Sequence, residues 1–328
     1  MKPRSLLVLL ACLGACGEPA SADGGGATSS SDSSSGGSES ESESETDSST
    51  AQTDESETDE SETETGETGE TGEPPGNPLL SDELINIAHR GGRELRPEAT
   101  LPAFETALMV GANVLEFDVH ASSDGVVVVM HDDTVNRTTD GTGLIKELSF
   151  DALRQLDAGY RFTTDGGETY PFRGVGIQIP TPAEIFAATP GEYYMIEIKQ
   201  AEPSIVPAFI NELVLAGVED RVVIASFDQG TLDEVRATAP AIFTSMSAAE
   251  MINFYSNGAE PGYEPPALFM QVPWEVVDQE LVDLAKTHGI RAHPWTVNGQ
   301  ALMLDMIGYG VDGIITDDPE LLEALLDG

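Results

Sequence analysis

Three ionisable side chains stand at alternate positions in an otherwise apolar stretch, NVLEFDVHASSDGVVVVMHD (113–132). They are Glu116, Asp118 and His120. Alternate residues of a strand point to the same face, so one face would gather two carboxylates and an imidazole. A buried charge costs several kcal/mol unless it is paired or bound to a metal. The pattern therefore indicates either a solvated face or a group of side chains gathered for chemistry.

Similar groups stand at the ends of other strand-like runs. They are two histidines, one carboxylate and two cations: His89, Arg90, His131, Glu197 and Lys199. Three carboxylates converging from two strands would repel one another unless a cation lay between them, and oxygen ligands favour Ca²⁺ or Mg²⁺. Imidazole titrates near neutral pH, so the two histidines suit a general acid and a general base. We therefore expect a metal at Glu116, Asp118 and Glu197, flanked by catalytic His89 and His131.

The elements that must position these groups follow one rhythm after residue 77. Strand-like runs cover 84–89, 113–120, 126–131, 193–199, 221–227, 241–246, 267–272, 290–297 and 311–316. Helical patterns lie between most of them, and several end in Gly, as helix C-termini often do. Continuously apolar strands that alternate with helices predict a parallel sheet covered by helices. About eight units in about 250 residues is the size of a TIM (β/α)8 barrel, which we expect over 78–328.

Two features qualify this fold prediction. A doubly wound open sheet is the alternative, but no GxGxxG follows the first strand-like run. Residues 132–180 break the rhythm, so we expect an insertion there, with one helix at SFDALRQLDAG (149–159).

A barrel carries its active site at the C-terminal ends of its strands. The candidate groups all fall at that end of their runs, and Trp295 falls there as well. We therefore expect them at one mouth, with Trp295 as a candidate substrate contact. His120 is in phase with Asp118, and either a supporting hydrogen bond or a direct role fits that position.

The first 77 residues differ in kind from the rest. Residues 1–15 carry Lys2 and Arg4 before SLLVLLACLGA, which is typical of a secretory signal peptide and too short to span a membrane. LGAC resembles the lipobox of bacterial lipoproteins, so we expect lipidation of Cys16. The exported protein would then be anchored to a membrane, facing the periplasm or the cell surface. An ordinary cleaved signal peptide is the alternative.

Residues 16–77 are dominated by Ser, Thr, Gly, Asp and Glu. Such a segment has too little apolar surface to offset the entropy of ordering it, so we expect a disordered spacer behind the lipid anchor. An acidic tail that binds a partner is the competing interpretation.

Charge and cysteine content exclude several kinds of partner and ligand. The chain has a formal net charge of −43, and no basic stripe offsets it. Nucleic-acid binding depends on Lys and Arg at the phosphates, so we expect no nucleic-acid partner. The only cysteines are Cys12 and Cys16, which leaves the mature chain without a thiolate metal site. No feature of the sequence indicates an oligomeric state.

Several short motifs agree with one known family in order and spacing. AHRGGRELRPEATLPAFETALMVGANVLEFDVHASSDGVVVVMHDDTVNRTTDGTG, followed by IPTPAEIF, MIEIK, IASFD, WTVN and GVDGIITDDP, resembles the signature of glycerophosphodiester phosphodiesterases. The resemblance spans about residues 84–322. It implies a TIM barrel that uses a divalent metal to hydrolyse glycerophosphodiesters to glycerol 3-phosphate and an alcohol.

The resemblance also implies roles for individual residues. It assigns Glu116, Asp118 and Glu197 to the metal, His89 and His131 to the acid–base pair, and Arg90 and Lys199 to the substrate phosphate. One departure is Ala99, which stands where the family's PENT motif usually has Asn.

Two other functions remain open at this stage. A lysophospholipase D-like activity on the same scaffold would need an apolar mouth, for which NFYSNGAEPGYEPPALF (253–269) offers Phe254, Tyr255 and Tyr263. A non-catalytic, surface-anchored binding module would be expected to have lost at least one essential group.

Overall fold

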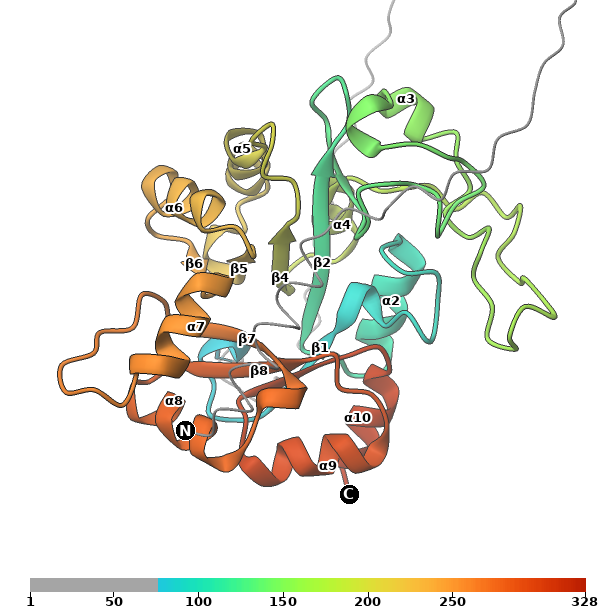
Figure 1. Ribbon diagram of the computed structural model, residues 1–328. Helices are drawn as coiled ribbons and strands as arrows, with labels where there is room; N and C mark the ends of the chain where they lie inside the picture. The colour runs from blue at the N-terminus through green and yellow to red at the C-terminus, as the bar shows by residue number, and fades with distance from the viewer. Residues whose placement is uncertain (1–75) are drawn as a thin grey trace, which may run out of the picture. The chain divides into compact units, whose positions relative to one another are not determined.

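The computed structural model describes residues 76–328 (Figure 1). The predicted signal peptide, Cys16 and nearly all of the predicted linker lie outside the described residues. No helix between residues 76 and 328 is both long enough and apolar enough to cross a membrane.

Parallel strands form the centre of the described chain. They are β1 (Ile85–Ala88), β2 (Val114–Ala121), β4 (Tyr193–Ile198), β5 (Val222–Ala225), β6 (Phe243–Thr244), β7 (Phe269–Pro273), β8 (Arg291–Trp295) and β9 (Gly313–Thr316). Six of them pair in the order β6-β5-β4-β2-β1-β9, and β7 pairs with β8.

Hydrogen bonds at two seams join these sheets into a ring. Beside β6 and β7, Met246 N donates to Phe269 O at 2.9 Å, and beside β8 and β9, Asp312 N donates to Ala292 O at 3.1 Å. The described residues therefore form the expected (β/α)8 barrel.

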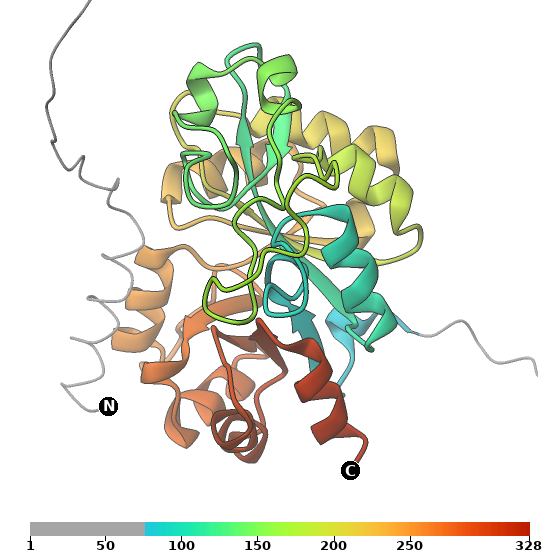
Figure 2. The same cartoon turned by 90° about the vertical axis from the view of Figure 1, so that its right-hand side faces the viewer.

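A helix follows each barrel strand and covers the outside of the ring (Figures 1 and 2). The helices are α2 (Leu101–Met109), α4 (Pro182–Ala188), α5 (Val206–Ala216), α6 (Gln229–Thr238), α7 (Ala248–Asn257), α8 (Gln279–Thr287), α9 (Gln300–Tyr309) and α10 (Pro319–Leu326). Short 3-10 helices are η1 (Pro78–Leu80), η2 (His89–Gly91), η3 (Ile145–Glu147), η4 (Glu219–Arg221) and η5 (Trp274–Val276). Local sequence sets the ends of the α-helices. Ser247 and Glu250 form a capping box at the start of α7, and Gly217 ends α5 in the left-handed conformation.

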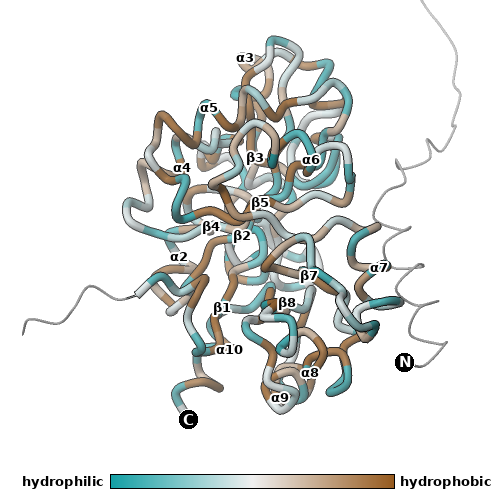
Figure 3. The backbone as a smooth tube through the Cα atoms, turned by 90° about the vertical axis from the view of Figure 1, so that its left-hand side faces the viewer, coloured by the Kyte–Doolittle hydropathy of each residue, from teal (hydrophilic) through white to brown (hydrophobic). Residues whose placement is uncertain are grey.

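The two faces of β2 explain its mixed composition. Phe117 points to the surrounding helices, with its ring centroid 5.6 Å from that of Phe104 and 6.2 Å from that of Tyr194. The alternate residues Glu116 and Asp118 point into the barrel. All of β2 is buried, and Figure 3 shows its neighbour-but-one β5 as a hydrophobic segment. The strand is thus buried on both faces, and its charged face lines the interior.

One run that we expected to be a barrel strand has another role. β3 (Val127–Val129) pairs antiparallel with β2 and forms a hairpin at its end. The hairpin leads the chain back, so that Met130 N donates to Asp118 O at 3.0 Å. His131 therefore reaches the mouth of the barrel because a hairpin folds back, and the rule for the ends of parallel strands does not apply to it.

The insertion expected at 132–180 is present, but its helix is shorter than predicted. The insertion and the end of the β2–β3 hairpin share a small core, made of Val128, Met130, Val135, Ile145, Leu153, Ala158 and Ile179. The helix expected at 149–159 is reduced to α3 (Phe150–Leu153). Beyond the end of the helix, Asp157 Oδ1 accepts from Gly159 N at 2.9 Å, a local side-chain bond that competes with helical hydrogen bonding. In Figure 2 the insertion lies beside the loop that follows β1.

Candidate active site

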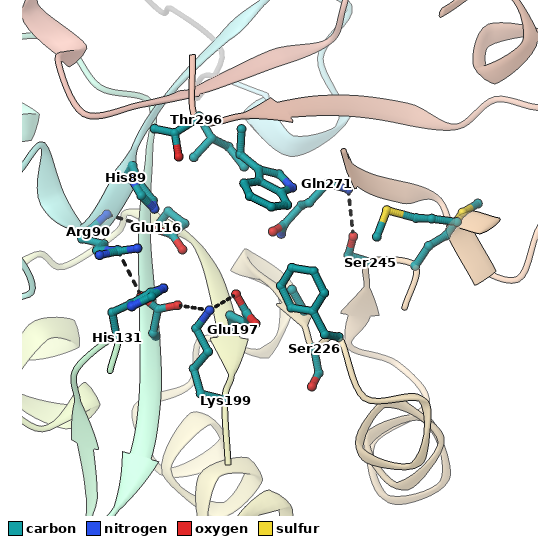
Figure 4. Close-up of a pocket in the computed structure, with 17 residues that line it drawn as sticks. His89, Arg90, Glu116, His131, Glu197, Lys199, Ser226, Ser245, Gln271 and Thr296 are labelled. Carbon is teal, nitrogen blue, oxygen red and sulfur yellow. Dashed lines mark hydrogen bonds and ion pairs between the residues drawn. The ribbon is translucent and has the colours of Figure 1, made fainter. Parts of the chain in front are cut away.

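A cavity of about 200 Å³ opens at the C-terminal ends of the barrel strands (Figure 4). The structure places all eight residues of the predicted site along its wall: His89, Arg90, Glu116, Asp118, His131, Glu197, Lys199 and Trp295. The other lining residues are Ala225, Ser226, Phe227, Ser245, Met246, Met251, Gln271, Thr296 and Ile315. The barrel thus brings together side chains that are up to 206 positions apart in the sequence, counting from His89 to Trp295.

Three carboxylates share this cavity: Glu116 and Asp118 are buried, and Glu197 is largely buried. Asp118 on β2 and Glu197 on β4 are register partners, so their side chains lie side by side, and Glu116 is two residues earlier on the same face. Burial and the charge of Asp118 raise the pKa of Glu116 well above its usual value. Burial also raises the pKa of Glu197, and Lys199 offsets this only in part. The cavity lining therefore combines three carboxylates with two cationic side chains, Arg90 and Lys199.

Two cations lie against the carboxylates. Lys199 Nζ is 2.7 Å from Glu197 Oε2 and 3.3 Å from Asp118 Oδ1, and Arg90 Nε is 3.7 Å from Asp118 Oδ2. Burial opposes the charge of Lys199, but the two carboxylates hold the pKa of Lys199 above its usual range. Burial likewise opposes the charge of Asp118, but Lys199 and His131 hold the pKa of Asp118 below its usual range.

The carboxylates fit a divalent metal by chemistry more than by their present spacing. Between residues 76 and 328, no three Asp, Glu, His or Cys side chains are close enough together to form a ready-made metal site. Lys199 takes up the space between Asp118 and Glu197 instead. Asp118 Oδ2 is buried and accepts no hydrogen bond from any described residue, which is a costly state for a carboxylate oxygen. The all-oxygen donor set and this unused acceptor suit Ca²⁺ or Mg²⁺.

His89 is held by a carboxylate that sequence reasoning did not single out. Its Nδ1 is 2.5 Å from Asp317 Oδ1, and the other oxygen of Asp317 accepts from Arg93 at 2.8 Å and Asn298 at 2.7 Å. Burial lowers the pKa of His89, while the hydrogen bond to Asp317 opposes this. Because Asp317 occupies Nδ1, Nε2 is the nitrogen of His89 that is left for chemistry.

His131 has a matching carboxylate partner. Its Nδ1 is 2.8 Å from Asp132 Oδ1, and Arg137 Nε donates to Asp132 Oδ2 at 2.8 Å. Arg137 also donates to Glu98 at 2.7 and 2.8 Å, and Arg90 donates to Glu98 at 3.0 Å. A continuous chain of charged groups therefore links Arg90 to His131 around the rim of the cavity.

The loop after β1 bends to make these contacts. Arg90 has φ 52° and Ala99 has φ 58°, and Ala99 N donates to Arg90 O at 2.9 Å. A left-handed backbone costs roughly 1–2 kcal/mol at most residues, whereas Asn tolerates it better. Ala99 is the position where the PENT motif usually has Asn. The departure thus places backbone strain beside the site, and the loop bond to Arg90 is still made.

Sequence reasoning assigned no role to four residues that connect the site: Glu98, Asp132, Arg137 and Asp317. All four lie inside motifs already noted in the sequence: RPEAT, MHDD, NRTT and GIITDDP. Their order along the chain was visible, but their contacts depend on loops whose course the sequence patterns did not predict.

The remaining histidines take structural positions. His120 Nε2 is 3.2 Å from His131 O, and His120 does not line the cavity, so it supports the backbone beside the site. His288 Nε2 is 2.8 Å from Gly258 O, as a structural residue would be. His293 is fully buried inside the barrel.

The apolar mouth considered at 253–269 is not present. Phe254 and Tyr255 are buried and Tyr263 packs against them in the core, and none of the three lines the cavity. Their helical spacing on and after α7 serves packing between helices. These aromatic side chains cannot provide a surface for a lipid chain.

Together, the barrel and its charged cavity define an enzyme of the (β/α)8 class whose site combines two carboxylate-bound histidines with a carboxylate cluster. A family model described as the glycerophosphoryl diester phosphodiesterase family matches residues 89–321. The chain belongs to this family.

Relatives support the assignment over most of the chain. A glycerophosphodiester phosphodiesterase of Caldanaerobacter subterraneus is 35% identical over 255 residues, covering 73% of this chain and 96% of the relative. One from Bacillus subtilis is 31% identical over 279 residues, covering 77% and 90%. Among solved structures, a phosphodiesterase of Oleispira antarctica has 27% identity and a TM-score of 0.64, covering 76% of this chain and 98% of that one.

Removal of the Glu98 charge tests the rim network. Burial alone would raise the pKa of Glu98, but Arg137 and Arg90 lower it to about 2 from its usual 4.5. Glu98→Gln should therefore lower the free energy of unfolding at pH 7 by about 3 kcal/mol, because Arg90 loses a buried partner. The lowered pKa means that this stabilisation is complete above the usual pKa and is lost as the pH falls from about 4.5 to about 2.

Urea unfolding of the wild type and of Glu98→Gln, from pH 7 to pH 2, measures the difference in their free energies of unfolding. Glu105→Gln, an exposed change on α2, is the matched control and should stay within about 0.5 kcal/mol of the wild type. A Glu98→Gln difference that does not depend on pH would contradict the ionic role.

Proposed function

We propose that the protein hydrolyses glycerophosphodiesters to glycerol 3-phosphate and an alcohol, using His89 and His131 as the acid–base pair and a divalent metal. One observation carries this proposal. Two histidines, each bound through Nδ1 to a carboxylate, border a cavity that also contains buried cations and a surplus of carboxylates. The names of the relatives support the substrate class, and the Oleispira antarctica structure is described as a complex with the product sn-glycerol-3-phosphate.

Arg90 and Lys199 are the groups suited to bind the phosphate. Arg90 is buried and Lys199 is largely buried, and both face the cavity, Arg90 from η2 after β1 and Lys199 from the end of β4. Their present partners are carboxylates of the same cavity. Arg90 and Lys199 would donate to the non-bridging oxygens and offset the charge that builds up in the transition state.

Glu116, Asp118 and Glu197 would hold the metal. The metal would supply charge stabilisation at the phosphate and lower the pKa of a bound water. Its positive charge would also balance the three carboxylates and compete with Lys199 for them, which leaves the Lys199 ammonium available to the substrate.

Each of the two histidines would transfer a proton to or from the reacting groups through its Nε2. One takes a proton from the nucleophile, which is water or a hydroxyl of the substrate's glycerol, and the other gives a proton to the departing alkoxide. Asp317 and Asp132 fix the orientation of each ring and stabilise its protonated form, as carboxylate partners of catalytic histidines do.

The two other functions have less support. A lysophospholipase D-like activity lacks the aromatic mouth that it was expected to use. A non-catalytic binding module would have lost an essential group, yet every residue that the family resemblance assigns to catalysis or binding lines the cavity. Comparing release from glycerophosphocholine with release from lysophosphatidylcholine separates the two hydrolytic activities.

Substitution of either histidine tests the acid–base pair. His89→Ala and His131→Ala should each lower kcat on glycerophosphocholine by about 10²- to 10⁴-fold without changing the fold, because each removes one proton transfer. Asp317→Asn, which keeps the shape of the side chain, should cause a smaller loss. The assay measures glycerol 3-phosphate release, and circular dichroism verifies the fold.

His288→Ala is the matched control, because His288 contacts the backbone of Gly258 and does not line the cavity. It should retain turnover even where it lowers Tm. Near wild-type kcat in both His89→Ala and His131→Ala would reject the pair.

Thermal unfolding tests the metal site without depending on activity. Ca²⁺ at about 100 times its Kd should stabilise the protein by about 2.7 kcal/mol, which corresponds to a rise in Tm of roughly 5–10 °C. Asp118→Asn should abolish this rise, whereas the exposed Asp305→Asn on α9 should retain it. An equal rise in the Asp118→Asn variant would place the ion elsewhere.

The N-terminus supports a membrane location for this activity. Lipidation of Cys16 would anchor the enzyme outside the cytoplasm, with residues 17–77 as the spacer. Cys16→Ser should then move the protein from the membrane fraction to the soluble fraction in its bacterial host, while Cys12→Ser should not. Retention of Cys16→Ser in the membrane fraction would reject lipidation at this residue.

A further inference from the structure

The cavity has two unlike walls (Figure 4). The charged groups come from the segments around β1 to β4. The opposite wall, from β5 to β8, has no formally charged side chain and includes Phe227, Met251, Gln271 and Trp295. A phosphodiester has two alcohol groups, here called arms, on one phosphate. An arm that lies against this second wall gives up its contacts with water for contacts with an uncharged surface. Such a surface favours a neutral arm over a charged one.

One polar side chain on the uncharged wall has no partner. Gln271 Nε2 is buried and donates to no described residue. The backbone of Gln271 is anchored separately, because its N donates to Ser245 Oγ at 3.2 Å. A buried amide donor without an acceptor costs about 1–3 kcal/mol, so a group that enters the cavity and accepts from Gln271 would recover this cost.

The serines on the same wall are already committed. Ser226 Oγ donates to Ile198 O at 2.8 Å, and Ser245 Oγ donates to Phe269 O at 3.3 Å. Gln271 is therefore a side chain of this wall whose hydrogen-bonding capacity is left for a ligand.

The polar residue paired with Gln271 on the adjacent strand, His293, does not accept from Gln271 Nε2 either. Gln271 on β7 and His293 on β8 are register partners, so both side chains lie on the same face of the sheet. No hydrogen bond joins them, and both ring nitrogens of His293 also lack partners. His293 is fully buried and does not line the cavity, whereas the amide of Gln271 extends into it, as Figure 4 shows.

The geometry points to Gln271 as a specificity-determining residue that donates a hydrogen bond to a hydroxyl of the substrate's glycerol arm. This assignment rests on the proposed glycerophosphodiesterase function and specifies which arm the enzyme reads. Glycerol is neutral and has hydroxyl acceptors, while Phe227, Met251 and Trp295 can pack against its carbon chain. The head group would then point away from the uncharged wall.

Substrates that each lack one glycerol hydroxyl test this role. The metal-loaded enzyme is assayed with glycerophosphocholine and with two analogues in which propane-1,2-diol or propane-1,3-diol replaces glycerol. The wild type should prefer glycerophosphocholine over at least one analogue by about 10- to 100-fold in kcat/KM, because that analogue leaves the amide unpaired. Gln271→Leu should lose this preference, through a higher KM for glycerophosphocholine and an unchanged value for that analogue.

Gln271→Glu covers the case in which the leucine variant does not fold. It keeps the size of the side chain but replaces the donor with a carboxylate, so it should lose the same preference. Gln279→Leu, the same substitution at an exposed position on α8, should keep it. A folded Gln271 variant that retains the wild-type preference for glycerophosphocholine over both analogues overturns this inference and leaves the proposed function standing. A wild-type enzyme that does not hydrolyse glycerophosphocholine overturns the proposed function and this inference with it.

Discussion

Electrostatic repulsion among three buried carboxylates is the constraint around which the site is organised. Glu116, Asp118 and Glu197 face one cavity because alternate residues of β2 and a register partner on β4 must point into the barrel. Burial strengthens their repulsion, since water no longer screens it. Lys199 and Arg90 face the three carboxylates with two positive charges, and burial together with the charge of Asp118 raises the pKa of Glu116. The proposed divalent cation would balance the remaining carboxylate charge.

The same requirement shapes the loops outside the barrel. Arg90 must be held at the carboxylates in a left-handed conformation, and Glu98 holds it there while also binding Arg137. Arg137 reaches Asp132 and so orients His131, whose position depends on the β2–β3 hairpin. The insertion therefore contributes to the candidate site, because its residues Asp132 and Arg137 connect Arg90, through Glu98, to the proposed catalytic residue His131.

The sequence was most informative where local periodicity determines position. Strand alternation was enough to place Glu116 and Asp118 on one face, and the rule for strand ends placed Glu197 correctly. His131 was placed correctly for the wrong reason, because an apolar run does not reveal whether its strand is parallel or antiparallel. Asp317 and Gln271 were missed, since a partner or an unpaired amide becomes visible only when strands distant in sequence are side by side. The sequence left two interpretations of the aromatic residues near Phe254, a lipid-binding mouth and ordinary packing, because core and surface aromatics can share the same spacing; the structure shows packing.

The central claim is that these carboxylates need a divalent metal to support phosphodiester cleavage. The most direct test follows glycerophosphocholine by ³¹P NMR with metal-stripped enzyme, before and after the addition of Ca²⁺ or Mg²⁺. The account predicts that the signal of glycerophosphocholine is replaced by that of glycerol 3-phosphate only after metal is added, and that EDTA stops the reaction. Undiminished formation of glycerol 3-phosphate by the metal-stripped enzyme would contradict it.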